Sequence, residues 1–158
     1  MEKKLMRVLF AGLFFVCATE IRAQVIASNF IVSTASARIA IAEESRLASK
    51  EGTTDEIKEY SALMIKDQGR LLGELKRLAV LRDITLPEDE TYKDDLSDKS
   101  GRQFNSAYIR TMISEHERDV RLFRQAITCG DPEVSAFAER YLPVIESHLK
   151  MIKSIKKR

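Results

Sequence analysis

Apolar residues recur every three or four positions along four stretches of the chain, and this spacing predicts amphipathic α-helices. The predicted helices run from about Ala27 to Lys50, from a capping box at Thr53 to about Arg82, from Ser100 to about Thr128, and from residue 132 nearly to the end. The apolar stripe of the second helix consists of Ile57, Tyr60, Met64, Leu71, Leu72, Leu75 and Leu78. Four such helices predict an all-α protein folded as a four-helix bundle.

The residues between the stripes predict how the helices are connected. Gly52 is predicted to end the first helix as a left-handed C-terminal cap, and Gly130 to end the third. Asp131 is predicted to cap the fourth helix. Residues 84–100 are rich in Asp, Glu and Lys and have little periodicity, so we expect one long connection between the second and third helices.

The N-terminus has the pattern of an export signal. Basic side chains accompany an apolar run at positions 5–18, which is followed by the small Ala23. This combination predicts a secretory signal over residues 1–23 and a bundle domain over residues 24–158. The run is shorter than the roughly 20 residues of a membrane-spanning helix, so an uncleaved anchor is the less favoured alternative. We therefore expect a protein secreted across the inner membrane, located in the periplasm or at the outer membrane.

The chain has two cysteines, and one of them lies inside the predicted signal. Cys17 could carry the acyl chains of a lipoprotein, but this alternative is less favoured because Phe14, Phe15 and Val16 stand where a small residue is usual. Cys129 would then be the one cysteine of the mature protein. No intramolecular disulfide is expected, and Cys129 is interpreted as a packing residue beside a helix end.

Charge argues against a nucleic-acid partner. The whole chain has 26 basic and 24 acidic residues, but removal of residues 1–23 leaves 22 of each. A nucleic-acid-binding protein would normally show a clear positive excess, so we exclude this class. The last helical turns are locally basic, and weak association with an anionic envelope surface is an alternative role for them. These residues are Lys150, Lys153, Lys156, Lys157 and Arg158.

Polar residues within the apolar stripes are the candidate binding site. They are Gln68 on the second helix, His116 on the third and His148 on the fourth, with Glu44 towards one side of the first. At about 1.5 Å of rise per residue, the first three lie at similar heights near the middle of the bundle. A buried polar group must be hydrogen-bonded or it destabilises the fold, so we expect these side chains to share one polar cluster.

The chain also resembles a known family, the exported bacterial proteins of domain of unknown function family 4142 (DUF4142). The resemblance covers about Phe30 to Ile155 and rests on short segments: Met64 to Asp67, Ser100-Gly101 with Phe104 and Tyr108, Glu115-His116, Leu142-Pro143 and His148-Leu149. It implies a ferritin-like four-helix architecture and export. No biochemical activity is firmly attached to the family.

The chain departs from the family pattern at its centre. The resemblance implies a Glu on the first helix, a His after the Asp of the second, and a His on each of the other two. Here the first two positions are similar to Ile41 and Gln68. Two imidazoles and an amide are a weak set for zinc or iron. A di-iron carboxylate site is excluded, because Ile113 and Ile145 stand three residues before His116 and His148, where such sites place a Glu.

The pattern as a whole favours an exported protein without enzymatic activity. The chain has neither a G-x-S-x-G nucleophile elbow nor a glycine-rich phosphate loop. We expect no cofactor and a binding or stress-related role, with an unidentified protein or small ligand of the cell envelope as partner. The alternative is a ferritin-like metal-binding protein that holds a transition metal ion through His116 and His148.

Overall fold

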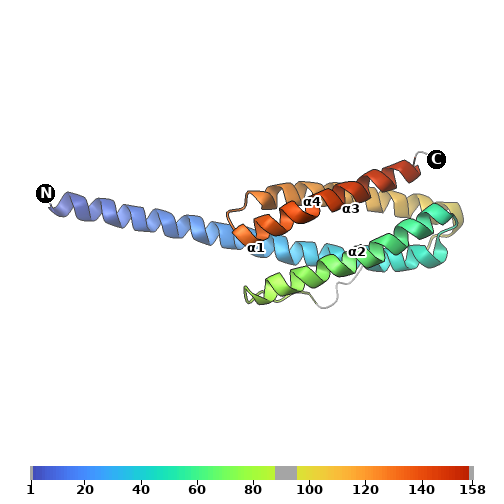
Figure 1. Cartoon of the computed structure of the whole chain (residues 1–158), viewed down its shortest axis with the longest axis horizontal. Helices are drawn as coiled ribbons and strands as arrows, with labels where there is room; N and C mark the ends of the chain where they lie inside the picture. Colours follow the sequence, from blue (N-terminus) through green and yellow to red (C-terminus); the bar gives the residue numbers. More distant parts are fainter. Residues whose placement is uncertain (1, 88–95, 157–158) are drawn as a thin grey trace.

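The computed structural model describes the backbone of residues 2–87 and 96–156 and, within these ranges, the side chains from residue 22 onward. It contains four helices: α1 (Glu2–Glu51), α2 (Asp55–Val80), α3 (Gly101–Ile127) and α4 (Pro132–Lys156). They pack as a bundle, and no strand occurs in the described ranges (Figure 1). The predicted all-α, four-helix architecture is confirmed.

Two antiparallel hairpins make up the bundle. Helix α1 packs mainly on α2, and α3 mainly on α4, while α1–α3 and α2–α4 contacts join the pairs. Asn105 near the start of α3 donates to the hydroxyl of Thr53 in the α1–α2 turn at 2.7 Å. Arg82 beyond the end of α2 pairs with Asp131 at the start of α4 at 2.6 Å. The predicted long connection therefore runs the length of the bundle and makes α2 and α3 parallel; its residues 88–95 lie outside the described ranges.

Helix α1 is longer than the sequence pattern predicts. It does not begin near Ala27 but runs without a break from Glu2. No Gly or Pro stands between residues 13 and 51 to end a helix, so the helix continues through the predicted signal. The side chain of Cys17, and with it the less favoured lipoprotein alternative, lies outside the described side chains.

The N-terminal apolar stretch is consistent with a signal sequence. Among described residues, 22–51 form the one helical segment long and apolar enough to cross a membrane by length and composition. Half of its most apolar window is buried inside the bundle, as expected of a core helix. Among the described side chains, which start at residue 22, Ala27 is the first that is buried in the core.

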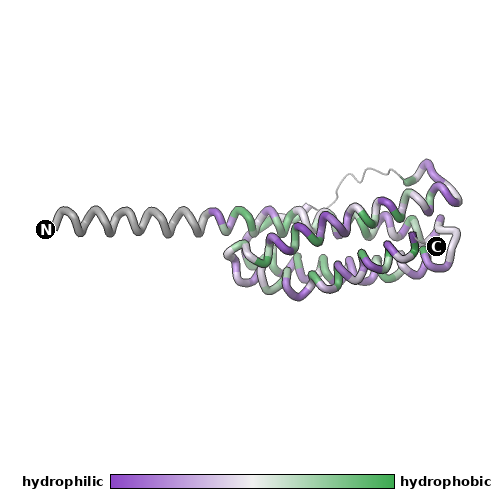
Figure 2. Tube along the Cα trace, turned by 90° about the horizontal axis from the view of Figure 1, so that it is seen from above, coloured by the Kyte–Doolittle hydropathy of each residue, from purple (hydrophilic) through white to green (hydrophobic). Residues whose placement is uncertain are grey.

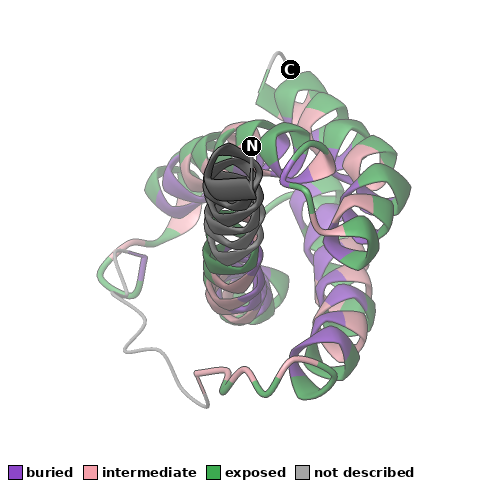
Figure 3. Ribbon diagram, turned by 90° about the vertical axis from the view of Figure 1, so that its left-hand side faces the viewer, coloured by how far each residue is buried: buried purple, intermediate pink, exposed green. Residues whose placement is uncertain are grey.

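Each bundle helix turns one apolar face inward. Figure 2 shows hydrophobic and hydrophilic residues alternating along the helices, and Figure 3 shows buried residues on their inner faces. The predicted stripe of α2 is buried throughout, except that Leu72 is partly exposed. Pro143 lies within α4, which continues past it as predicted.

The helix ends confirm some of the predicted caps and correct others. Asp131 caps α4: its Oδ1 accepts the backbone N–H groups of Glu133 and Val134 at 3.1 and 2.9 Å. Helix α2 is capped by Thr54 rather than Thr53, because Thr53 is hydrogen-bonded to Asn105 on α3. The contact between Thr53 and α3 therefore places the cap of α2 one residue later than the sequence predicts.

The two turn glycines serve different purposes. Gly130 has a φ of +89° and is left-handed, as predicted. Gly52 is not among the positive-φ glycines, so the prediction of a left-handed cap there is wrong. Glycine is needed here because the end of α1 and the start of α2 approach closely. A Cβ at this position would lie 2.5 Å from the carbonyl oxygen of Ala48 and 2.8 Å from Cγ2 of Ile57.

Gly52→Ala is expected to destabilise the protein by about 1–3 kcal/mol, because the backbone carbonyl of Ala48 cannot move without unwinding the end of α1. Gly73→Ala is the matched control. No atom lies within 4 Å of a Cβ at Gly73, and alanine favours helix, so this change should stabilise the protein by roughly 0.5–1 kcal/mol. Urea denaturation measures both, and effects of equal sign would contradict the steric explanation.

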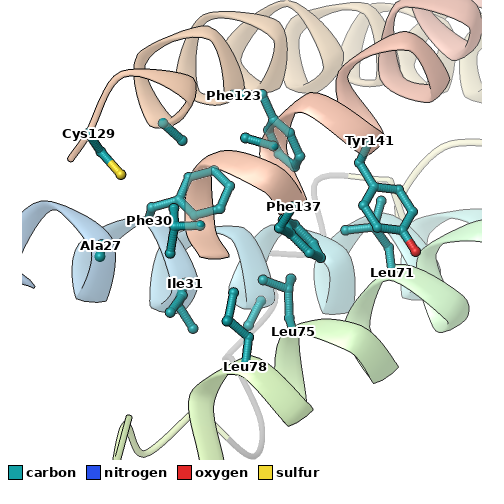
Figure 4. Close-up of a cluster of buried hydrophobic side chains, with 14 of the residues drawn as sticks. Ala27, Phe30, Ile31, Leu71, Leu75, Leu78, Phe123, Cys129, Phe137 and Tyr141 are labelled. Atoms are coloured by element: carbon teal, nitrogen blue, oxygen red, sulfur yellow. The ribbon is translucent and has the colours of Figure 1, made fainter. Parts of the chain in front are cut away.

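The hydrophobic core consists of two clusters, one towards each end of the bundle. The first includes Phe30, Leu75, Phe123 and Phe137 and lies where α1 enters the bundle (Figure 4). The second lies at the other end and consists of Ile41, Ala48, Ile57, Tyr60, Met64, Leu96, Phe104, Ala107, Tyr108, Met112 and Ile152. On every helix a polar residue separates the two clusters.

Candidate functional site

The boundary between the two hydrophobic clusters is a layer of polar side chains contributed by all four helices. We call it the polar layer. It consists of Arg38 on α1, Asp67 and Gln68 on α2, His116 and Asp119 on α3, and His148 on α4. Five of these residues are at most 3% exposed, and the Asp67 side chain is 15% exposed. Such a layer needs internal partners for its polar groups, because water reaches almost none of them.

The two histidines lie next to each other in this layer, as their heights along the helices predict. Their ring centroids are 5.6 Å apart and the rings are nearly perpendicular, with an interplanar angle of 84°. Gln68, also predicted for this cluster, is buried at the same level of α2. Its side-chain nitrogen donates to the sulfur of Met64 at 3.6 Å.

The hydrogen bonds of the histidines determine which ring nitrogen carries the proton. Nδ1 of His116 lies 2.8 Å from the carbonyl oxygen of Met112, which can only accept, so Nδ1 is the donor. Nε2 of His148 lies 3.0 Å from a carboxylate oxygen of Asp67 and is likewise the donor. Each neutral ring therefore keeps a lone pair on its other nitrogen: Nε2 of His116 and Nδ1 of His148.

Both lone pairs are buried, and neither has a hydrogen-bond partner among the described residues. Burial lowers the pKa of His116 to about 4, against the opposing effect of the hydrogen bond to Met112. Burial also lowers the pKa of His148, although Asp67 acts in the opposite direction. Both rings are thus neutral at pH 7, and the two lone pairs are available to an electron-pair acceptor.

Glu44 lies elsewhere. It is buried and lines a surface groove of about 710 Å³ between α1 and α3, together with Glu115 and Arg118. The groove opens to solvent, and small side chains of α1 form much of its floor. Glu44 therefore belongs to this groove and not to the polar layer.

Arg38 and Asp119 are the residues that the sequence analysis missed. They form an ion pair whose two side chains are completely buried. Nε and Nη1 of Arg38 and Oδ1 of Asp119 have no partner among the described residues. A signal was present: Arg38 stands seven residues after Ile31, and Asp119 seven after Met112, which places both on buried helix faces.

The polar layer offers imidazole nitrogens, an amide oxygen and a thioether rather than a carboxylate cage. No group of three or more His, Cys, Asp or Glu side chains that could hold a metal ion occurs in the described part of the chain. The available electron pairs are the two imidazole nitrogens, the unpartnered Oε1 of Gln68 and the thioether of Met64. Imidazole and thioether are ligand types that suit copper, whereas carboxylates suit harder ions.

The chain is a four-helix bundle with one long crossover between α2 and α3 and a buried polar layer at its middle. Residues 18–155 match the family described as Domain of unknown function (DUF4142), and the chain belongs to this family. A solved structure, "CopM in the Cu(I)-bound form", has the same fold with a TM-score of 0.72 and 20% sequence identity. The similarity covers 83% of this chain and 95% of that chain. No curated protein matches the chain.

Proposed function

We propose that the protein is an exported metal-binding bundle that holds one transition metal ion between His116 and His148. The observation that carries this proposal is the pair of buried imidazole lone pairs, both without a partner among the described residues, on rings 5.6 Å apart. A buried acceptor without a donor costs about 1–3 kcal/mol, and two adjacent ones call for a shared occupant. A metal ion is an occupant that accepts two lone pairs at once.

The surroundings of both rings support metal coordination. A metal-binding histidine characteristically donates its second N–H to a carboxylate or a backbone carbonyl, which fixes the ring and makes the free nitrogen more basic. Asp67 does this for His148, and the carbonyl of Met112 does it for His116. Sequence spacing alone did not identify Asp67 in this role, although it directly precedes Gln68.

Copper is the metal that we expect. The structural relative is in a Cu(I)-bound form, and two imidazoles, with the thioether of Met64 hydrogen-bonded to Gln68 of the same layer, suit copper better than they suit four-coordinate zinc or iron. The metal-binding alternative is therefore better supported than the partner-binding or small-ligand role first expected from the sequence. Because the N-terminal apolar stretch suggests a signal sequence, we propose that copper is bound outside the cytoplasm, in the periplasm or at the outer membrane.

The test is elemental analysis of the protein purified from the cells that export it, after loading with copper and dialysis. We expect about one ion per chain in the wild type and none in a His116→Ala, His148→Ala double variant, because two ligands are lost. Cys129→Ser is the matched control. Cys129 is buried beside the α3–α4 turn, outside the polar layer, so this variant should keep its metal.

Circular dichroism establishes that each variant is folded. Copper retained by the folded double variant would place the ion elsewhere. A wild type that binds no metal would return the protein to the partner-binding role.

A further inference from the structure

We propose that Arg38, by neutralising the buried carboxylate of Asp119, leaves the polar layer with a single negative charge and so makes it selective for a monovalent soft ion over a divalent one. Arg38 is then a specificity-determining residue that does not bind the metal itself. The inference rests on the proposed function, since it concerns the same site. Nothing in the similarity to known proteins assigns a role to this pair.

The ion pair lies beside the candidate ligands. Asp119 follows His116 by three residues on α3, so the two side chains project from neighbouring positions on one helix face. Arg38 reaches Asp119 from α1 across the bundle. Because Asp119 stands one helical turn from His116, the charge of Arg38 lies beside the His116 ring and beside an ion held between the two rings.

The formal charges of the layer favour a single positive charge. Arg38 and Asp119 cancel, the two histidines are neutral, and Asp67 leaves a net charge of minus one. Arg70 also contacts Asp67, but its side chain is 59% exposed and is screened by solvent. A monovalent ion therefore makes the layer neutral, whereas a divalent ion leaves one uncompensated positive charge in the core.

An uncompensated buried charge is costly, and this layer cannot remove it. Arginine does not deprotonate in proteins, so Arg38 cannot lower its own charge when a cation enters. The thioether of Met64, which is held 3.6 Å from the Gln68 nitrogen, adds a donor that prefers soft ions. Charge and softness thus favour the same class of ion, one with a single charge and a filled d shell.

The test compares Ag(I), a soft monovalent ion that does not change oxidation state, with Zn(II) in chloride-free buffer. Competition calorimetry gives the ratio of the two affinities for the protein purified from the exporting cells. Arg38→Met makes the layer more negative and should lower the Ag(I)-to-Zn(II) affinity ratio at least about tenfold, as expected for one unit charge at an effective dielectric near 20. Asp119→Asn makes it more positive and should raise the ratio at least about tenfold.

The matched control is Arg38→Met with Asp119→Leu, which removes both charges and keeps the net charge at minus one. Its affinity ratio should stay within about threefold of the wild type. If Arg38→Met does not fold, the role of Arg38 is tested by the two other variants. The affinity ratio should rise in Asp119→Asn and stay unchanged in the double variant. Equal ratios in all folded variants would overturn the role of Arg38 and leave metal binding intact. A wild type that binds neither ion would overturn the proposed function as well.

Discussion

Arg38→Met is expected to destabilise the metal-free protein by about 3–5 kcal/mol, because it leaves the carboxylate of Asp119 buried without its partner. Both side chains are completely buried, so neither charge can be compensated by water. The free energy of unfolding from urea denaturation measures the effect.

The double variant Arg38→Met with Asp119→Leu distinguishes the contribution of the ion pair to stability from the cost of leaving one buried charge unpaired. Apolar residues of similar volume often replace a buried ion pair without loss, so we expect this protein to be within about 1 kcal/mol of the wild type or more stable. A loss equal to or greater than that of Arg38→Met would mean that the ion pair itself stabilises the fold. The same double variant serves in the metal-selectivity test, so one set of proteins supplies both measurements.

The metal-free protein is expected to lose stability as the pH falls from about 6.5 to about 4. Burial lowers the folded-state pKa of His116 from 6.5 to about 4, so the unfolded chain takes up a proton first and unfolding is favoured in this window. The full loss from His116 is about 3 kcal/mol, and the lowered pKa of His148 adds to it in the same direction. Above about pH 6.5 the contribution is fully present.

A His116→Gln, His148→Gln variant is the control for this pH dependence. Carboxylates such as Asp131, whose pKa is also lowered, destabilise both proteins at acidic pH, so the histidines account for the difference between the two curves. Thermal melts between about pH 8 and about pH 4 measure it, with the window taken from the unfolded and folded histidine values. Parallel curves would mean that the imidazoles are solvated.

The bundle could be predicted because the apolar pattern of each helix lies within the sequence of that helix. An apolar stripe is a property of one helix, so the stripe of α2 and the mid-bundle positions of His116 and His148 follow from spacing alone. The start of α1 could not be predicted in this way. The predicted signal is itself a good helix former, and nothing in the sequence separates it from the bundle helix that follows.

Contacts between helices explain most of what the sequence could not supply. Arg38 and Asp119 are charged, and their burial becomes plausible only when each is known to face the other across the bundle. Gly52 could be recognised as a turn residue, but the close approach of Ala48 and Ile57 is a property of the folded hairpin. The cap of α2 is Thr54 rather than the predicted Thr53, because Asn105 on α3 is hydrogen-bonded to Thr53.

The placement of the polar layer between two hydrophobic clusters also determines how the helices align along the bundle axis. A slide of α4 by one turn, about 5.4 Å, would move His148 into an aliphatic cluster and bring an apolar residue against Asp67. Leucine-rich stripes by themselves tolerate such slides, because one apolar contact replaces another. The Arg38–Asp119 pair and the His148–Asp67 bond tie α1 to α3 and α4 to α2 at a single height. The layer therefore selects one axial alignment of the two hairpins.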